Sequence, residues 1–282
     1  MEKFPFNADL HSHSTFSDGV FTPEELAQRA HRNQVDLWAL TDHDTLEGAE
    51  SAQQAAQKWG ISFVAGVEIS TLFEGVSVHI VGLNVDFHNQ VLKEGIASVR
   101  NTRFARAQKM SAEFEKIGIA NALEGAMAFC QNQNTISRAH CARFWVNIGK
   151  AKTKAEVFEN FMVPGKPGYV PHQWASIDQA ISWIHQANGV AVLAHPGRYD
   201  FSKNAFARLL SFFKENGGDA LEVASSAHSK DEILRWAKTA QHYDFYASLG
   251  SDFHDATECH CDLGKAPALP AHLKPVWNLW LA

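Results

Sequence analysis

Short apolar runs rich in Val, Ile, Leu, Phe and Ala recur along the chain, and each ends in a cluster of polar residues. Runs of this length and composition predict buried β-strands. We expect seven strands, at residues 4–10, 35–41, 61–70, 76–85, 189–195, 219–224 and 245–251. Helical patterns alternate with most of them, as at 23–33, 176–188 and 230–242. Repeated strand and helix units predict an α/β fold with parallel strands inside and helices outside, as in a barrel.

The alternation stops between the fourth and fifth predicted strands. From about residue 90 to residue 169 the pattern is helical only, at 91–117, 123–131, 138–148 and 153–161. Proline and glycine residues at 164–168 then predict a turn that closes this part of the chain. We therefore expect a barrel formed by residues 1–99 and 170–282, with a helical insertion at residues 100–169.

Composition and charge narrow the class of protein. With 45% hydrophobic and 20% charged residues, the chain has the composition of a soluble globular protein. The apolar runs are far shorter than the ~20 residues that span a bilayer, and the N-terminus lacks the pattern of a signal peptide, so we expect a cytoplasmic protein. Residues 100–170 hold 11 Lys or Arg against 5 acidic residues, a balance of +6 that leaves −12 on the rest. This basic segment indicates either a site for an anionic ligand or a solvated helical surface.

Histidine and carboxylate side chains lie at or near the ends of the predicted strands, which a parallel barrel would bring to one face. His11 and His13 are two residues apart, so their side chains point to the same side of an extended segment, and Asp252 and His254 repeat this spacing. The candidate metal ligands are His11, His13, Asp18, His43, Glu68, His79, His195, Asp252 and His254.

Nine ligands are too many for one ion and suit two or three ions with a bridging carboxylate. Imidazole and carboxylate ligands without thiolates favour manganese, zinc or iron over calcium. Adjacent ions of this kind stabilise the attacking and leaving oxygens of a phosphoryl displacement, which makes a phosphoesterase the expected activity.

Several motifs, in this order and at this spacing, resemble the polymerase and histidinol phosphatase (PHP) family: DLHSHS with Asp18-Gly19, LTDHD, GVEIS, HIVGL, LAHPGR and GSDFH. The segments at 137–140, 166–171 and 277–280 are further similar to the branch that contains ribonuclease AM, a 5′-3′ exoribonuclease, and nucleoside 3′,5′-bisphosphate phosphatases.

The resemblance implies a distorted (β/α)7 barrel with three divalent ions, with manganese favoured and zinc or iron as alternatives. By the family pattern, one ion would be held by His11, His13, Glu68 and Asp252. A second would be held by Glu68, His79 and His195, and a third by Asp18, His43 and His254. His195, His254 and Asp252 are the expected catalytic residues, with a histidine transferring the proton of the leaving group.

The basic insertion is expected to cover the active site and select the substrate. Guanidinium groups bind phosphate in bidentate fashion, and we expect Arg138 and His140, rather than Arg106, to bind a 5′-phosphate because they follow a loop at a predicted helix start. Further expected substrate contacts are Arg100, Asn101, Arg103, Asp44 and Ser70. The expected substrates are 3′,5′-nucleoside bisphosphates and short 5′-phosphorylated ends of RNA or single-stranded DNA.

Two other functions compete with this interpretation. A histidinol-phosphatase-like monoesterase for small metabolites would use the same metals, but it would not require a basic insertion of about 70 residues. A PHP module that serves a polymerase is the other, although no polymerase segment follows the seventh predicted strand. We expect neither a membrane segment nor an obligate protein partner.

Overall fold

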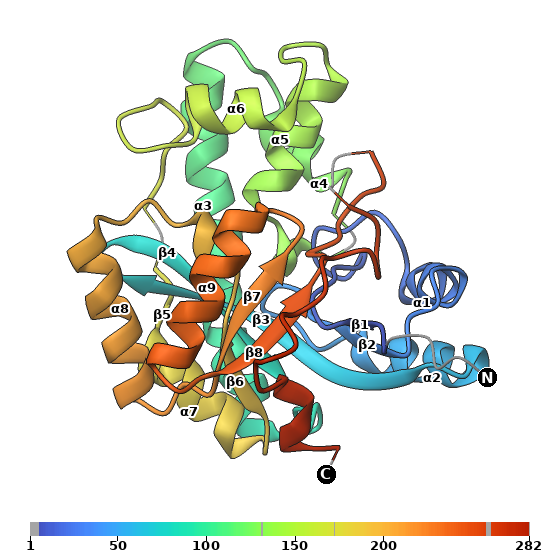
Figure 1. Cartoon of the computed structure of the whole chain (residues 1–282). Coiled ribbons are helices and arrows are strands. Elements are labelled where there is room, and N and C mark those ends of the chain that lie inside the picture. The colour runs from blue at the N-terminus through green and yellow to red at the C-terminus, as the bar shows by residue number, and fades with distance from the viewer. Residues whose placement is uncertain (1–5, 131, 172, 258–260, 282) are drawn as a thin grey trace.

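The strands form one strongly curved sheet that nearly closes into a barrel (Figure 1). A computed structural model gives the positions of residues 6–130, 132–171, 173–257 and 261–281. The sheet order is β1 (Ala8–Asp9), β2 (Leu37–Leu40), β3 (Ser62–Phe73), β4 (Val76–Leu83), β6 (Val190–Leu193), β7 (Ala220–Ser225) and β8 (Tyr246–Gly250). The edge strands β1 and β8 lie close together, and the Leu10 N–H beside β1 donates a hydrogen bond to the Leu249 carbonyl of β8 at 3.1 Å. The predicted α/β barrel is confirmed.

One strand runs against the predicted direction. The prediction that all strands are parallel is wrong for β4, which pairs antiparallel with both β3 and β6. Glu74 and Gly75 connect β3 to β4 with positive φ angles of 48° and 81°, the backbone of a tight two-residue hairpin that leaves no room for a crossover helix. His79 stands opposite Ser70 in this hairpin. The antiparallel direction of β4 therefore places His79, in the first half of the strand, at the barrel end where β3 carries Glu68.

Two further details of the strands differ from the predictions. A short strand, β5 (Ala175–Ser176), pairs with β3 outside the main path and was not predicted. The first predicted strand is shorter than expected, since β1 covers Ala8–Asp9, and residues 4 and 5 lie outside the described residues.

Helices cover the outside of the barrel. They are α1 (Pro23–Arg32), α2 (Ala49–Trp59), α7 (Ile177–Gln186), α8 (Lys203–Glu215) and α9 (Lys230–His242). Local sequence sets their starts, because Thr22 and Ser229 form capping boxes with glutamates three residues later. Buried Ile184 of α7 and Leu209 of α8 share one core with Val192 of β6. None of the described helices combines the length and the apolar composition needed to cross a membrane.

The chain between β4 and β5 is helical, as predicted, and forms a lobe above one end of the barrel (Figure 1). It contains α3 (Gln90–Lys116), α4 (Ala122–Met127), α5 (Arg138–Asn147) and α6 (Lys154–Phe161). Leu92 and Ile96 of α3 belong to the barrel core, whereas Phe114 packs with Trp145 in a separate apolar cluster. The helix α3 thus extends from the barrel into the lobe. We call this lobe the helical insertion. The domain boundary at residue 100 lies within α3 and stays a prediction.

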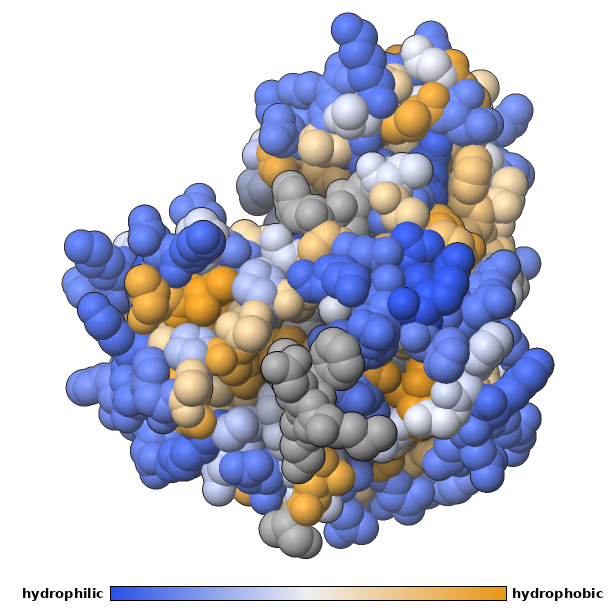
Figure 2. All heavy atoms as spheres, turned by 45° about the vertical axis from the view of Figure 1, so that its right-hand side comes forward, coloured by the Kyte–Doolittle hydropathy of each residue, from blue (hydrophilic) through white to orange (hydrophobic). Residues whose placement is uncertain are grey.

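Three short 3-10 helices complete the described elements: η1 (Gln133–Thr135), η2 (Pro196–Arg198) and η3 (Val276–Leu279). The surface of the helical insertion and the barrel is largely hydrophilic and is indented between the two in the view of Figure 2.

Candidate metal centre

All nine predicted ligands gather at the end of the barrel beneath the helical insertion. They come from loops after β1, β2, β6 and β8 and from the β3–β4 hairpin. Within each of three groups of these residues, the ligand atoms lie within 4.8 Å of one another. The first group is His11, His13, Glu68 and Asp252, and the second is His43, Glu68 and His79. The third group is His13, Asp18, His43 and His254. His195 joins them through its Nε2, which lies 2.9 Å from Glu68 Oε1.

Glu68 occupies the middle of the cluster and is fully buried. Its Oε2 lies within 3.3 Å of ring nitrogens of His11, His13 and His43. Its Oε1 lies within 2.9 Å of His79 and His195. Because each oxygen faces a different set of imidazoles, the Glu68 carboxylate has the geometry of a ligand that bridges two ions.

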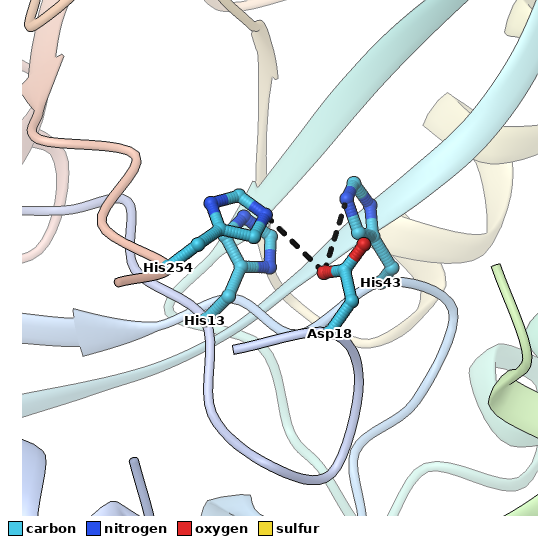
Figure 3. A group of neighbouring side chains, drawn as sticks. All are labelled: His13, Asp18, His43 and His254. Atoms are coloured by element: carbon cyan, nitrogen blue, oxygen red, sulfur yellow. Dashed lines mark ion pairs between the residues drawn. The ribbon is translucent and has the colours of Figure 1, made fainter. Parts of the chain in front are cut away.

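Asp18 lies among three histidines at the edge of the cluster, His13, His43 and His254 (Figure 3). Its Oδ1 lies 3.2 Å from His254 Nε2 and 3.8 Å from His43 Nε2, and the His13 and His254 rings stack with centroids 4.1 Å apart. The loop from His13 to Gly19 turns tightly, since a Cβ at Gly19 would lie 2.1 Å from the His13 carbonyl oxygen. This turn, which requires glycine, returns Asp18 to the histidines.

Electrostatics and hydrogen bonding both favour bound cations. Burial raises the pKa of the Glu68 and Asp18 carboxyls, but the neighbouring histidines outweigh burial and hold both pKa values well below their usual range. Among the described residues, His11 Nε2, His13 Nε2, Glu68 Oε2 and Asp18 Oδ1 are buried without a hydrogen-bond partner. Two ligands about 2.1 Å from one ion stand roughly 3.0–3.4 Å apart, as these atoms do. The cluster therefore fits divalent metal ions.

Neighbouring carboxylates orient the predicted ligands. His11 Nδ1 lies 3.0 Å from Glu222 Oε1, which turns Nε2 of the same ring toward Glu68. Asp42 accepts hydrogen bonds from the Ser14 and Ser17 hydroxyls and so holds the loop that carries Asp18. Glu222 was not among the predicted site residues. Its position in the predicted strand at 219–224, beside the ends of the other strands, could have indicated that it belongs to the site.

The backbone is strained where several site residues stand. Asp44, His195 and Asp252 have φ angles of 50°, 25° and 52°, a region that residues other than glycine seldom adopt. Such conformations persist when surrounding contacts hold them, and they concentrate at functional sites.

A cavity of about 670 Å³ opens in front of the cluster, between the barrel and the helical insertion. The ligands on its wall are Asp18, His43, His79, Asp252 and His254. The helical insertion contributes cationic side chains, which we call the basic wall, from Arg103, Arg106, Arg138, Lys152 and Lys154. Phe158 and Trp174 add aromatic surface. The volume suits a ligand the size of a nucleotide.

The basic wall holds several positive charges close together. Burial, with the nearby charges of Arg138 and Arg103, lowers the pKa of Arg106 to about 9. Burial and Arg103 also lower the pKa of Arg138. Because these cations repel one another, each makes its neighbour's charged form less stable. An anion bound in the cavity would therefore stabilise the basic wall.

The cavity separates the predicted substrate contacts into two groups. Arg103, Arg138 and Ser70 line it. Asp44 lies beneath them, fully buried, where it accepts hydrogen bonds from the Ser70 hydroxyl at 2.9 Å and from Arg103 Nε at 2.9 Å. Asp44 therefore holds cavity residues in place and is itself covered.

Three other predicted contacts do not line the cavity. Arg100 pairs with Glu47 at 2.8 Å, and Asn101 is exposed. His140 is buried and accepts a hydrogen bond from the Ser137 backbone N–H at 3.0 Å, and burial lowers its pKa to about 4. The structure thus gives His140 a part in starting α5.

Several cavity residues were missing from the predicted set. Arg106 follows Arg103 by three residues on α3, which is the helical spacing that places two side chains on neighbouring parts of one face. Arg198, within the LAHPGR motif, forms an ion pair with Asp252 Oδ2 and lines the cavity. For Lys152 and Lys154 the only available signal was the basic charge of the segment, and for Trp174, which lies beyond that segment, it was the capacity of an aromatic ring to stack on a base.

Comparison with known proteins agrees with this geometry. A family model described as PHP domain matches residues 9–251. A 3′,5′-nucleoside bisphosphate phosphatase of Chromobacterium violaceum is 45% identical over 272 residues, covering 96% of this chain and 95% of that protein. The 5′-3′ exoribonuclease Rnm of Escherichia coli K12 is 44% identical over 274 residues, covering 96% and 93%.

A solved structure shows the same fold. It is an amidohydrolase from Chromobacterium violaceum with bound sulfate and no metal, which superposes with a TM-score of 0.94 at 45% identity. The match covers 97% of this chain and 95% of that one. Together with the family match over most of the sequence, this shows that the chain belongs to the PHP domain family.

Proposed function

We propose that this chain is a metal-dependent phosphoesterase that acts at the 3′-oxygen of nucleotides carrying a 5′-phosphate. The observation that carries the proposal is that one cavity has metal-ligand residues on one wall and the basic wall on another. The relatives named as a bisphosphate phosphatase and as an exoribonuclease support the same substrate class.

One binding geometry accounts for both activities. The basic wall binds the 5′-phosphate, and the phosphorus on the 3′-oxygen of the same nucleotide lies at the metal cluster. If that phosphorus is a terminal monoester, the products are a 5′-mononucleotide and inorganic phosphate. If it links the next nucleotide, a 5′-mononucleotide leaves and the next residue carries the new 5′-phosphate, so repeated steps degrade an RNA or DNA end from 5′ to 3′.

The proposed metal content is three divalent ions, with manganese favoured and zinc or iron as alternatives. His11, His13, Glu68 and Asp252 would hold the first, Glu68, His79 and His195 the second, and Asp18, His43 and His254 the third. Such ions supply Lewis-acid stabilisation and lower the pKa of water for attack on phosphorus.

The chain's own residues support this reaction in distinct ways. Of the two histidines predicted to transfer a proton, His254 lines the cavity, whereas His195 is buried against Glu68 and suits a ligand role. His254 is therefore proposed to face the leaving oxygen, and it can protonate that oxygen only while its ring is not bound to the third ion. Arg198 stands beside Asp252 at the cavity wall, where its guanidinium can bind a phosphate oxygen. Residues 100–169 are proposed to form the insertion that selects the 5′-phosphate.

A small-metabolite monoesterase is not favoured. Such a substrate carries one phosphate and leaves the basic wall without a ligand. The test is to incubate manganese-loaded protein with a 3′,5′-bisphosphate, a 5′-phosphorylated RNA oligonucleotide and histidinol phosphate, and to compare kcat/KM. We expect the first two to exceed the third by at least about 100-fold, which is the value of one lost charge-assisted contact or two. A preference for histidinol phosphate would contradict the proposal.

A further inference from the structure

The helix α5 and its N-cap residue touch one predicted metal ligand, Asp18, at two points. The Ser137 hydroxyl donates to Asp18 Oδ2 at 3.1 Å, and Arg143 donates from Nη2 to the Asp18 backbone carbonyl. Ser137 is the N-cap of α5, and Arg138, the first residue of the helix, lines the cavity as part of the basic wall. A metal ligand of the barrel and a phosphate-binding side chain of the insertion are therefore joined through consecutive residues.

The two oxygens of Asp18 face different surroundings. Oδ1 faces His254 and His43 and has no hydrogen-bond partner among the described residues. Oδ2 is the acceptor for Ser137. A carboxylate held at one oxygen presents the other in a fixed direction, which is how neighbouring hydrogen bonds orient metal ligands.

The hydrogen bonds around Ser137 direct its proton to Asp18. Its Oγ accepts from the Ala139 backbone N–H at 3.1 Å, which is the capping interaction. His140 Nδ1 lies 3.2 Å from the same hydroxyl, but this nitrogen already accepts from the Ser137 backbone N–H. The carboxylate is the stronger acceptor, because hydrogen bonds to an ionised group are the stronger ones.

We propose that Ser137 is a positioning residue that fixes Asp18 as a ligand of the third ion and couples that ion to phosphate bound at Arg138. The inference rests on the proposed function for the presence of this ion. Since coupling between two sites is reciprocal, a 5′-phosphate in the cavity tightens the third ion and the ion tightens the phosphate.

The experiment measures Mn²⁺ binding by equilibrium dialysis, with and without adenosine 5′-monophosphate. The variants are Ser137→Gly, which removes the hydroxyl at little cost to the helix cap, and Ser137→Thr, which keeps it. Ser202→Gly is the matched control, because the Ser202 hydroxyl also caps a helix, α8, by accepting from a backbone N–H, that of Ala205. In Ser137→Gly we expect the weakest-bound Mn²⁺ to bind about 10- to 100-fold more weakly, as is typical when such a contact is lost.

The nucleotide effect separates positioning from general damage to the fold. Adenosine 5′-monophosphate should tighten the weakest Mn²⁺ in the wild type, Ser137→Thr and Ser202→Gly, and should lose this effect in Ser137→Gly. Unchanged Mn²⁺ affinity in Ser137→Gly, or equal weakening in Ser202→Gly, would overturn the inference. Wild-type protein that binds none of Mn²⁺, Zn²⁺ and Fe²⁺ would instead contradict the proposed function itself.

Discussion

At the scale of single residues, Glu68 carries the largest share of the proposed centre. Its two oxygens face separate sets of histidines, so one substitution removes a ligand from two ions. We predict that Glu68→Gln lowers bound manganese from three ions to one and kcat/KM by at least about 1000-fold, since each ion contributes several kcal/mol to phosphoryl transfer. Metal analysis and steady-state kinetics check both values. Glu74→Gln, which removes an exposed carboxylate paired with Arg208, should change neither.

His140 makes a prediction about pH. Burial lowers its pKa to about 4, below the usual 6.5, so the unfolded chain binds more protons than the folded one between these values. The stability from His140 is present above about pH 6.5 and is lost as the pH falls toward 4. The variant His140→Gln can keep the capping hydrogen bond but does not titrate in this range. As the pH falls from roughly 7 to 5, we therefore expect its free energy of unfolding to rise by about 2 kcal/mol relative to that of the wild type.

The measurement for His140 is denaturant unfolding of metal-free wild type and His140→Gln across this range. Comparison at each pH cancels the titration of the other histidines. A constant difference between the two proteins would show that His140 does not titrate in this way.

Sequence predicted residue types better than side-chain directions. The nine predicted ligands gather because the topology brings the loops after β1, β2, β6 and β8 to the barrel end that carries Glu68 and His79. Their binding of metal stays a prediction. Arg100 and Arg103 lie on the same helix and carry the same charge, yet one pairs with Glu47 and the other contacts Asp44. Both partners lie in the loop between β2 and α2, so the difference depends on how that loop meets α3, and no pattern within the helix reports it.

At the scale of elements, the contact between α3 and α7 is unusually close. A Cβ at Gly95 would lie 2.3 Å from the Trp183 ring. Glycine to alanine in a helix ordinarily stabilises by about 1 kcal/mol, but overpacking costs about 1–3 kcal/mol. We predict that Gly95→Ala lowers the free energy of unfolding by up to about 2 kcal/mol, the overpacking cost less the helix gain, measured by urea denaturation. The double variant Gly95→Ala with Trp183→Leu should recover part of this loss, and a more stable single variant would refute the close contact.

The hairpin of β3 and β4 shows where prediction of elements from sequence ends. The extents of both strands were close to those observed, and Glu74-Gly75 is a turn signal between them. The parallel pattern was inferred from the rest of the chain, where helices separate the strands. Only the short connection distinguishes an antiparallel pair here, and it explains why His79 reaches the cluster from the first half of its strand.

At the scale of the whole molecule, the basic and acidic segments of the sequence occupy opposite sides of one cavity. The excess of basic residues in the helical insertion faces an acidic and imidazole-rich barrel end across one cavity. Sequence indicated both charges and their separate segments. It did not show their distance or that Arg106, Lys152 and Lys154 share the cavity with Arg138, because these depend on how the insertion sits on the barrel.

The central claim is that the basic wall selects a 5′-phosphate for a metal centre that acts at the 3′-oxygen. The most direct measurement compares turnover of two RNA oligonucleotides that differ only in a 5′-phosphate or a 5′-hydroxyl, with wild type, Arg138→Ala and Arg100→Ala. We predict an about 10- to 100-fold preference for the 5′-phosphate, lost in Arg138→Ala and kept in Arg100→Ala, since Arg100 lies outside the cavity. Equal turnover of the two oligonucleotides by the wild type would contradict the claim.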